Sequence, residues 1–307
     1  MRKVFKVLGI ILLVIVILVV ILFIIASRKP FVPNNYTEIV KTEGKIETKY
    51  LNNGKYDVGY YEAATMSSFK KFEIFYPKDI NNMGKLPVVV FVNGTGAVGS
   101  KYKALQKHMA SWGFITIATE EENAWNGFSA EMCVRFLELA DVYEDEKNEN
   151  ILKGHIDMDR IGITGHSQGG IGVINALTEQ RHASIYKAAV LLSSAETEMA
   201  KALLWDSDSS KINTNTLMFS STGKTDSAIS PLEGISKTYE SITDNVSKIM
   251  ARRNDCDHGE MLYYADGYVT AWFMYYLQND EEAGKVFAKN GELANNSLYQ
   301  DVQTNIQ

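Results

Sequence analysis

The sequence predicts an α/β fold in which helices cover both faces of a mostly parallel sheet. Short Val- and Ile-rich runs such as Pro87–Val92 and Phe114–Ala118 recur along the chain, and strands that are buried on both faces require such runs. Helical patterns separate these runs, and alternating strands and helices give right-handed crossovers between parallel strands. In addition, a glycine-rich turn at 165–169 joins one buried run directly to a helix.

The N-terminal segment is expected to lie outside this fold. Val7–Ala26 is apolar throughout apart from Gly9, and about twenty such residues span a hydrocarbon core as a helix. A cleaved signal peptide is the alternative, but its apolar region is usually about 7 to 15 residues long and small residues precede its cleavage site. We therefore expect residues 1–28 to be an uncleaved membrane anchor.

Positive charges flank this apolar run on both sides. The terminal amine, Arg2, Lys3 and Lys6 precede it, and Arg28 and Lys29 follow it. This small excess favours an internal N-terminus, because positively charged flanks stay in the cytoplasm. We expect a single-pass protein of the cell membrane with the bulk of the chain outside it; if the segment is cleaved as a signal, the chain is secreted instead.

The rest of the chain divides into a linker and one domain. Residues 29–55 are polar and mixed, with Pro30 and Pro33, which is typical of a linker. Residues 56–307 are long enough for one large α/β domain. The net charge of -6 and the absence of a Lys/Arg cluster beyond the N-terminal flank argue against a nucleic-acid partner.

Cysteine usage indicates neither a disulfide framework nor a metal site. Only Cys133 and Cys256 occur, and their spacing fits no metal-binding pattern. They could form a single bridge in an oxidising compartment, but Cys133 falls in a predicted helix and nothing in the sequence brings it beside Cys256. No cofactor and no metal ion is therefore expected.

The elements of the domain follow in order. Alternation over Phe69–Tyr76 predicts a half-buried strand that ends at Pro77. After the two buried runs named above, four more strands are expected at Arg160–Thr164, Ala188–Leu192, Thr216–Ser220 and Ser247–Ala251. Helices are expected between the strands or after them, for example at Tyr102–Ser111, Ser129–Tyr143 and Tyr268–Leu277.

The turn Gly165-His166-Ser167-Gln168-Gly169 has the pattern G-x-S-x-G between a strand and a helix. This arrangement is typical of a nucleophile elbow, which holds a serine hydroxyl exposed at the carboxyl end of a sheet. Glycines in and around the turn remove the side chains that would block a strained backbone. The alternative is a glycine-rich turn in which Ser167 only caps the following helix.

A serine hydroxyl becomes a good nucleophile only when a base takes its proton. Of the five histidines, His258 lies in a polar loop after the last predicted strand and before the last long helix. In the chain order serine, acid, histidine, the base belongs on such a loop. The other four are expected to be surface residues or to have ordinary hydrogen-bond partners: His108, His155, His166 and His182.

The acid should lie between Ser167 and His258, on a loop that leaves a late strand. Asp226 lies in the loop after Thr216–Ser220, and we expect it to hold the ring of His258 in one tautomer and to stabilise its imidazolium form. Competing acids are Asp206, Asp208 and Asp257, the last of which is too close in sequence to His258 to meet the same edge of its ring.

Acyl transfer also needs N–H donors directed at the oxygen that becomes negative. One is the backbone N–H of Gln168, which follows the nucleophile. The other is expected from the glycine-rich loop Val92–Gly99, in which the backbone N–H of Thr95 should face the substrate carbonyl. These two groups form the predicted oxyanion hole.

These features together resemble the α/β-hydrolase superfamily, and within it the compact bacterial esterases of the cutinase-like, chlorophyllase-like and dienelactone-hydrolase-like groups. The resemblance extends from about residue 55 to residue 287. It is carried by the elbow and by four other stretches: Val88–Gly96, His108–Phe114, Asp257–Gly259 and Thr270–Phe273 with the following Asn279–Asp280.

The resemblance implies the triad Ser167, Asp226 and His258, with Thr95 and Gln168 as oxyanion donors. Two tryptophans, Trp125 and Trp205, fall where substrate-lining tryptophans lie in related enzymes. Cutinase-like enzymes often carry an aromatic residue on the oxyanion loop, where this chain has Thr95, which weakens the case for an aromatic polyester as substrate.

Two classes of function follow. The first is a membrane-anchored serine hydrolase that cleaves small or medium carboxylic esters outside the cell through an acyl-enzyme on Ser167, in a cleft without a long lid. The second keeps the same scaffold for an acyltransferase or peptidase acting on cell-envelope material, or for a non-catalytic binding module. A binding module needs no complete triad, so covalent labelling of Ser167 by a fluorophosphonate separates catalysis from binding, and capture of the acyl group by an added alcohol separates a transferase from a hydrolase.

Overall fold

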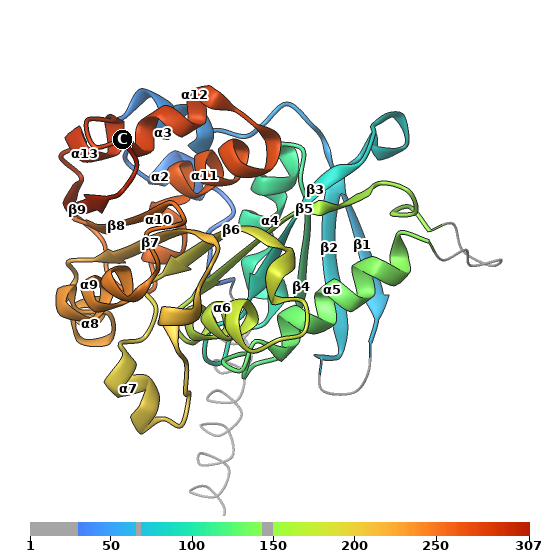
Figure 1. Cartoon of the computed structure of the whole chain (residues 1–307). Helices are drawn as coiled ribbons and strands as arrows, with labels where there is room; N and C mark the ends of the chain where they lie inside the picture. Colours follow the sequence, from blue (N-terminus) through green and yellow to red (C-terminus); the bar gives the residue numbers. More distant parts are fainter. Residues whose placement is uncertain (1–29, 66–68, 143–149) are drawn as a thin grey trace, which may run out of the picture. The chain divides into compact units, whose positions relative to one another are not determined.

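The computed structural model describes residues 30–65, 69–142 and 150–307. Within them the strands form one nine-stranded sheet in the order β1-β2-β4-β3-β5-β6-β7-β8-β9 (Figure 1). Strands β4, β3, β5, β6, β7 and β8 are parallel to one another, while β1, β2 and β9 pair antiparallel. The strand bounds are β1 Val58–Ala64, β2 Lys71–Pro77, β3 Leu86–Val92, β4 Ile115–Thr119, β5 Ile156–His166, β6 Tyr186–Leu192, β7 Asn215–Ser221, β8 Lys248–Arg253 and β9 Tyr299–Thr304.

The predicted α/β class with a mostly parallel sheet is confirmed. Every strand expected from a buried apolar run is present, although β5 begins four residues before the expected Arg160. The two edge strands, β1 and β9, were not expected from the sequence. Both are only partly buried along their length, so neither carries the continuous apolar run that marks an inner strand.

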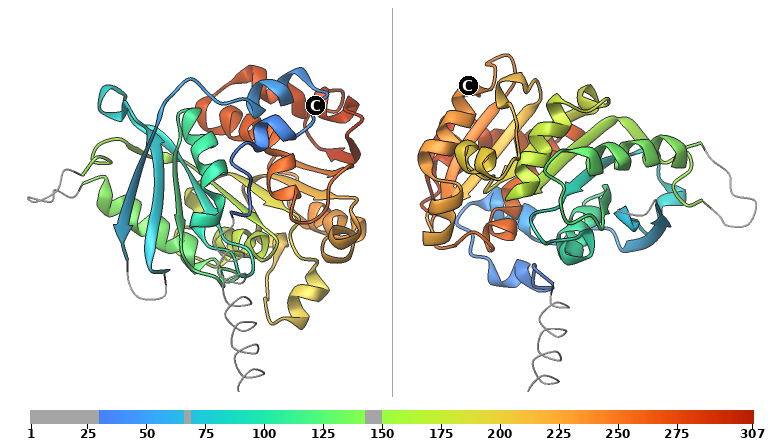
Figure 2. Two further views of the ribbon diagram at one scale, coloured as in Figure 1. Left: turned by 180° about the vertical axis from the view of Figure 1, so that it is seen from behind. Right: turned by 90° about the horizontal axis from the view of Figure 1, so that it is seen from below.

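Helices cover both faces of the sheet, as Figures 1 and 2 show from three sides. On one face α5 and α6 pack on β3, and α9 packs on β7 and β8; on the other face α4 packs on β2 and β4, and α11 packs on β5 and β6. In β3, Val88, Val90 and Val92 belong to the first core, and Val89 and Phe91 belong to the second. Alternate side chains of a strand point to opposite faces, so each face has its own apolar core. The helix bounds are α4 Lys103–Ser111, α5 Phe128–Ala140, α6 Gln168–Thr178, α7 Thr197–Ala202, α8 Lys224–Ile229, α9 Leu232–Ser241, α10 Met261–Tyr264, α11 Asp266–Gln278, α12 Glu281–Gly284 and α13 Glu292–Asn295.

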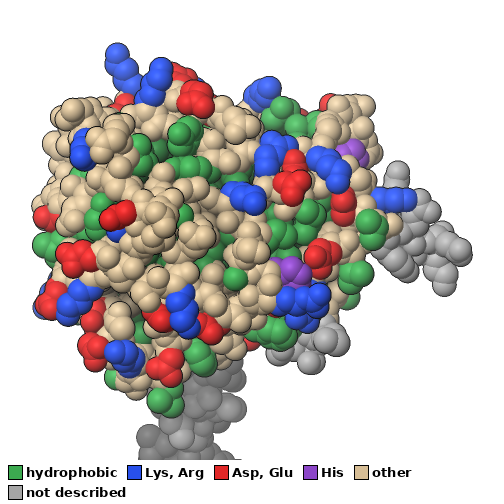
Figure 3. All heavy atoms as spheres, in the orientation of Figure 1, with side chains coloured by type: hydrophobic (Ala, Val, Ile, Leu, Met, Phe, Trp, Pro, Cys, Tyr) green, Lys and Arg blue, Asp and Glu red, His purple; other side chains and the backbone are tan. Residues whose placement is uncertain are grey.

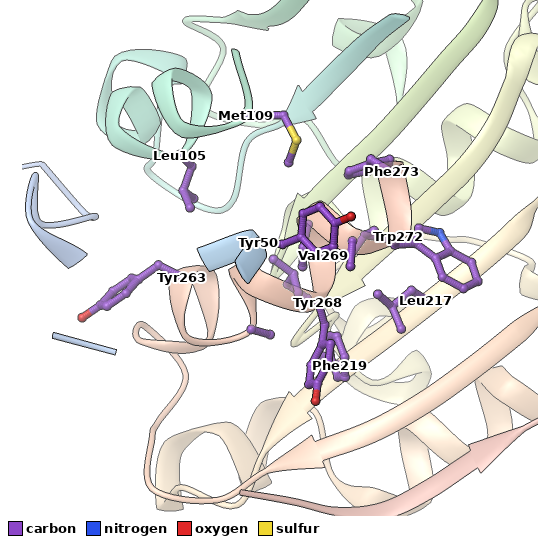
Figure 4. Packing of buried hydrophobic residues seen from close by; sticks show 14 of the residues in the cluster. Tyr50, Leu105, Met109, Leu217, Phe219, Tyr263, Tyr268, Val269, Trp272 and Phe273 are labelled. Carbon is purple, nitrogen blue, oxygen red and sulfur yellow. The ribbon is translucent and has the colours of Figure 1, made fainter. Parts of the chain in front are cut away.

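An aromatic cluster lies under α11. Tyr268, Trp272 and Phe273 of this helix are fully buried and lie close to Tyr50 and Phe219, which come from distant parts of the chain (Figure 4). Large aromatic side chains contribute much of the apolar area that a core removes from water. The cluster therefore holds the N-terminal part of the domain against the last long helix.

Residues 32–55 are part of the folded domain rather than the expected linker. They form α2, Tyr36–Ile39, and α3, Lys45–Leu51, and belong to the compact unit that runs from Val32 to the C-terminus. Tyr36 and Tyr50 are fully buried. The linker prediction is corrected from Val32 onward, because the polar residues of this segment find buried partners far along the chain.

The main such partner is Arg253, at the end of β8. Its side chain is fully buried and donates from Nη1 to the carboxylate of Glu47 in α3 over 2.9 Å. The same nitrogen donates to the Tyr264 carbonyl and to the Tyr299 hydroxyl, and Nη2 donates to the Lys41 carbonyl. Arg253 thus connects the N-terminal segment to the strand that precedes the His258 loop.

Replacing Arg253 with methionine is expected to lower the free energy of unfolding by about 3–5 kcal/mol, because the Glu47 carboxylate would stay buried without its counter-ion. Urea unfolding followed by far-UV circular dichroism measures this loss. Lys237→Met is the control, since Lys237 pairs with Glu233 where both side chains are more than half exposed. Equal stability of the two variants would contradict the role given to Arg253.

The predicted membrane span, Val7–Ala26, lies outside the described residues. In the ranges that the structure describes, no helix has both the length and the apolar character needed to cross a bilayer. The face of the molecule seen in Figure 3 carries basic and acidic side chains interspersed, without a large patch of one sign.

Both cysteines are buried and unpaired. Cys133 belongs to the core on the α5 side of the sheet and Cys256 to the core on the α11 side, so the sheet separates them. No group of three or more His, Cys, Asp or Glu side chains suited to a metal ion occurs among the described residues.

Candidate active site

Ser167 lies in a sharp turn between β5 and α6. Its φ of 59° is in the left-handed region, which a non-glycine residue adopts only at a cost that its surroundings offset. Two backbone hydrogen bonds hold the turn: the Ser167 N–H donates to the Leu192 carbonyl of β6, and the Gly170 N–H donates to the Ser167 carbonyl, each over 2.9 Å. The serine is thus fixed at the carboxyl end of the central strands.

The two outer glycines of the turn allow this close approach of strand and helix. A Cβ on Gly165 would lie 2.3 Å from the Gly169 carbonyl oxygen, and a Cβ on Gly169 would lie 2.3 Å from the Val92 carbonyl oxygen. Both contacts are with rigid backbone, so neither position accepts a side chain. The glycine pattern therefore reflects steric need, and Ser167 does not cap α6 with its own side chain.

His258 reaches the serine from the loop between β8 and α10. The Ser167 hydroxyl lies 3.0 Å from Nε2 of His258, and Nδ1 of the same ring lies 2.7 Å from Oδ1 of Asp226. A carboxylate accepts hydrogen bonds only, so Nδ1 carries the proton and Nε2 is free to accept the serine proton. The three side chains form one continuous chain of hydrogen bonds.

Asp226 lies in the first turn of α8, directly after β7, and its side chain is fully buried. Its second oxygen, Oδ2, accepts the backbone N–H of Ser221. With one oxygen on the backbone and the other on the His258 ring, the carboxylate cannot rotate freely. Strands β7 and β8 are parallel neighbours, which brings the loops carrying the acid and the histidine to the same edge of the sheet.

The competing acids do not contact the ring of His258. The Asp208 carboxylate binds the N–H and hydroxyl of Ser210, and the Asp257 carboxylate accepts backbone N–H groups. Asp206 is held through its backbone carbonyl, which accepts from the side-chain amide of Asn175.

The loop after β3 curls beside the nucleophile. A Cβ on Gly94 would lie 3.7 Å from the Ser167 Cβ, so the loop and the elbow are in contact. The Ala97 N–H donates to the Gly94 carbonyl over 3.1 Å, and Gly96 has a φ of 65°, as the third residue of a type II turn requires. Thr95, the second residue of this turn, is exposed, and its N–H is not used in the turn bond.

Gln168 is the first residue of α6, so its backbone N–H has no partner within the helix. Gln168 follows Ser167 directly, so this N–H lies at the start of α6, next to the serine. The loop after β3 is anchored by Asn93, whose side-chain amide donates to the carbonyls of Thr119 and Glu121 over 2.8 and 2.7 Å. This anchor was not expected from the sequence.

His166 lies against His258. The two rings are 4.6 Å apart between centroids, and Nε2 of His166 donates to the backbone carbonyl of His258 over 2.8 Å. Burial, and secondarily the neighbouring His258, lowers the pKa of His166 to about 4. His166 is therefore neutral at neutral pH and supports the histidine loop without placing a second charge beside it.

Two of the other histidines have hydrogen-bonding or ionic partners away from this site. Nδ1 of His108 lies 2.7 Å from the buried Asp266 carboxylate, and Nδ1 of His182 lies 3.0 Å from Glu131. His166, by contrast, lies next to His258, and nothing in the sequence around His166 predicted this.

Trp125 and Trp205 are partly buried and pack on the core of the α5 side. The side-chain amide of Asn175, in the second turn of α6, donates to the carbonyl of Trp125 and to that of Asp206, so one residue ties both loops to this helix. Their expected part in substrate binding stays a prediction.

One comparison with known proteins gives a match, and the matched region includes the residues of the candidate site. A family model described as "PETase: PET hydrolase-like" matches residues 42–304, which include Thr95, Ser167, Asp226 and His258. No curated protein matches the chain.

Proposed function

Because the chain belongs to the PET hydrolase-like family, whose members are carboxylic ester hydrolases, we propose that it cleaves esters through an acyl-enzyme on Ser167. The observation that carries this proposal is the hydrogen-bond chain from Ser167 through His258 to Asp226, with distances of 3.0 and 2.7 Å. This arrangement is what a serine needs in order to attack a carbonyl carbon.

In the first half of the reaction, Oγ of Ser167 attacks the ester carbonyl carbon while Nε2 of His258 takes the hydroxyl proton. The carbonyl oxygen becomes negative and accepts hydrogen bonds from the backbone N–H groups of Thr95 and Gln168. Asp226 stabilises the imidazolium. The imidazolium then gives its proton to the leaving alcohol oxygen as the carbon–oxygen bond breaks.

In the second half, water attacks the acyl carbon while His258 takes a proton from it. Collapse of the second tetrahedral intermediate breaks the bond to Oγ, releases the carboxylic acid and returns the proton to Ser167. Ser167 and His258 end in their starting protonation states, so the enzyme is ready for the next ester.

The substrate is proposed to be a small or medium acyl ester in an open cleft. In the part of the chain that the structure describes, the connection between β6 and β7 holds two short helices, the six-residue α7 and the three-residue 3-10 helix Ser209–Lys211, and no long lid. Thr95 provides no aromatic ring beside the scissile bond, which favours aliphatic acyl groups over an aromatic polyester.

The site of action is proposed to be the outer side of the cell membrane, with residues 1–28 as a single-pass anchor. The apolar run Val7–Ala26 and the charges around it support this placement. Cell fractionation with protease protection of intact cells tests it: the catalytic domain should sediment with membranes and be accessible from outside.

Covalent labelling tests the serine chemistry. A fluorophosphonate probe should react with the full-length protein in mild detergent, because Oγ of Ser167 displaces fluoride from phosphorus. Mass spectrometry should locate the adduct on Ser167, and prior heat denaturation should abolish it. A folded protein that stays unlabelled would reject catalysis by this serine and would favour a binding module.

An ester series then separates hydrolase from transferase. Turnover should be greatest with short acyl chains and absent with peptides and amides. Added alcohol should leave free acid as the main product if water is the natural acceptor, whereas predominant transfer to the alcohol would favour an acyltransferase.

A further inference from the structure

Two segments touch each other beside Ser167. One is residues 222–226, which carry Asp226 and run into α8 and are called the acid loop; the other is residues 254–258, which carry His258 and are called the histidine loop. A Cβ on Gly223 would lie 2.5 Å from the Cα of Asp257 and 2.6 Å from the Cys256 carbonyl oxygen. The absence of a side chain at this position therefore permits the two loops to approach. The Thr222 N–H also donates to the Arg253 carbonyl over 2.9 Å, at the point where both loops leave the sheet.

The carboxylate of Asp257 lies at this contact. Its Oδ1 accepts the backbone N–H of Asp226 and the backbone N–H of its own neighbour His258, each over 2.8 Å. Its Oδ2 accepts the backbone N–H of Thr225 over 3.3 Å. One side chain thus holds the backbone of the triad acid and the backbone of the triad base at the same time.

These contacts also complete the N-terminus of α8. Gly223 precedes this helix and has no side chain to cap it, so the first N–H groups of the helix lack partners of their own. Asp257 supplies the missing acceptor from a different loop, and its negative charge lies at the positive end of the helix. Asp226 belongs to that first turn, so the cap also orients the triad acid.

The backbone of Asp257 is fixed as well. Its N–H donates to the Glu260 carboxylate over 2.9 Å, and its carbonyl accepts the N–H groups of Glu260 and Met261 at the start of α10. The three N–H groups around its side chain, from Asp226, His258 and Thr225, lower the pKa of Asp257 to about 2. The carboxylate is therefore ionised throughout the pH range in which an esterase is assayed.

From this geometry we infer that Asp257 is a positioning residue, which sets the distance between Asp226 and His258 by binding the backbones of both loops. The inference rests on the proposed function, in which these two residues act together on Ser167. It assigns to Asp257 a part that differs from the acid role considered from the sequence, since its carboxylate binds backbone N–H groups and not the imidazole.

Asp257→Ala removes all three acceptor contacts. The expected result is a kcat for a short-chain p-nitrophenyl ester that is about 10- to 100-fold lower, because small misplacements of catalytic groups cost up to about 100-fold. KM should change less than twofold, since Asp257 does not touch the substrate. Asp257→Asn keeps a side-chain oxygen for the Asp226 and His258 N–H groups, and should restore kcat to within about threefold of wild type.

Two further variants serve as comparisons. Asp255→Asn makes the same charge change in the same loop at an exposed residue with a φ of 51°, a conformation that asparagine tolerates, and kcat should stay within twofold. Gly223→Ala forces the loops apart without removing any charge and should lower kcat as Asp257→Ala does. If Asp257→Ala does not fold, Gly223→Ala decides: an unchanged kcat overturns the inference.

A spectroscopic measurement separates this inference from the proposed function. The proton between Nδ1 of His258 and Asp226 should give a low-field 1H NMR signal in the full-length protein, lost to solvent exchange in Asp257→Ala and retained in Asp257→Asn. If wild type neither turns over esters nor reacts with the fluorophosphonate, the proposed function fails and this signal alone decides the positioning role. If Asp257→Ala keeps wild-type kcat and the signal, the positioning role is rejected.

Discussion

Replacing Ser167 with alanine is expected to lower kcat toward a short-chain p-nitrophenyl ester by about six orders of magnitude, the effect of removing the nucleophile from a serine triad. The methyl group cannot attack the carbonyl, and His258 loses the hydroxyl that lies 3.0 Å from its Nε2. KM should change little, because the oxyanion loop and the cleft remain. Initial rates with active-site titration of contaminating esterase measure the loss.

Ser194→Ala is the matched control for this variant. Ser194 lies beside the elbow, where a Cβ on Gly170 would meet its Cβ at 2.6 Å, and its buried hydroxyl has no hydrogen-bond partner among the described residues. Removing that hydroxyl should leave kcat within twofold. If Ser167→Ala retained more than one per cent of the wild-type rate, the acyl-enzyme mechanism would have to be abandoned.

Asp226→Asn is expected to lower kcat by about four orders of magnitude at neutral pH, as in other serine triads. The Asn oxygen should keep the Ser221 N–H, which leaves the side-chain NH2 facing Nδ1 of His258. The ring must then carry its proton on Nε2 and cannot accept the proton of Ser167. The expected loss thus comes from the wrong tautomer rather than from a damaged fold.

The control for this substitution is Asp206→Asn, at an acid that also lies between the serine and the histidine in the chain. Among the residues that the structure describes, Asp206 has a hydrogen-bond contact only through its backbone carbonyl, with Asn175, so its carboxylate should be dispensable. Thermal unfolding of both variants should match wild type within a few degrees. A large loss in Asp206→Asn with none in Asp226→Asn would move the acid to the earlier loop.

The inner strands were predictable because burial on both faces imposes a sequence pattern that no other element needs. The run in β3, Leu86–Val92, is buried at all seven positions. The edge strand β9, Tyr299–Thr304, has one neighbour and one fully buried residue, so its sequence resembles a loop. Local pattern therefore identifies the centre of this sheet and not its borders.

The N-terminal segment was misinterpreted for a related reason. Glu47 is polar, yet it is buried, and its partners Arg253, Asn296 and Tyr299 lie more than 200 positions away. No window of sequence around Glu47 contains the information that its charge is compensated. A polar segment that packs through distant partners has the same composition as a linker.

The chain order of strands and loops allowed us to predict which residues meet at the site, because the loops after successive parallel strands meet at one edge of the sheet. What chain order does not give is how neighbouring loops contact each other. Asp257 adjoins His258 in sequence, but its binding of the Asp226 and Thr225 backbones depends on the pairing of β7 with β8. His166 likewise meets His258 only because the elbow faces the last loop.

The buried contact between Tyr36 and Asp266 limits where a protease can cut the N-terminal segment without damage to the domain. A cut ahead of Val32 would leave α2 and α3 on the domain, and the fragment that begins there should keep the fold. A cut in the turn between these helices would separate Tyr36 from the carboxylate of Asp266, to which it donates over 2.5 Å. A harmless cut and a damaging one are therefore separated by only about ten residues of chain.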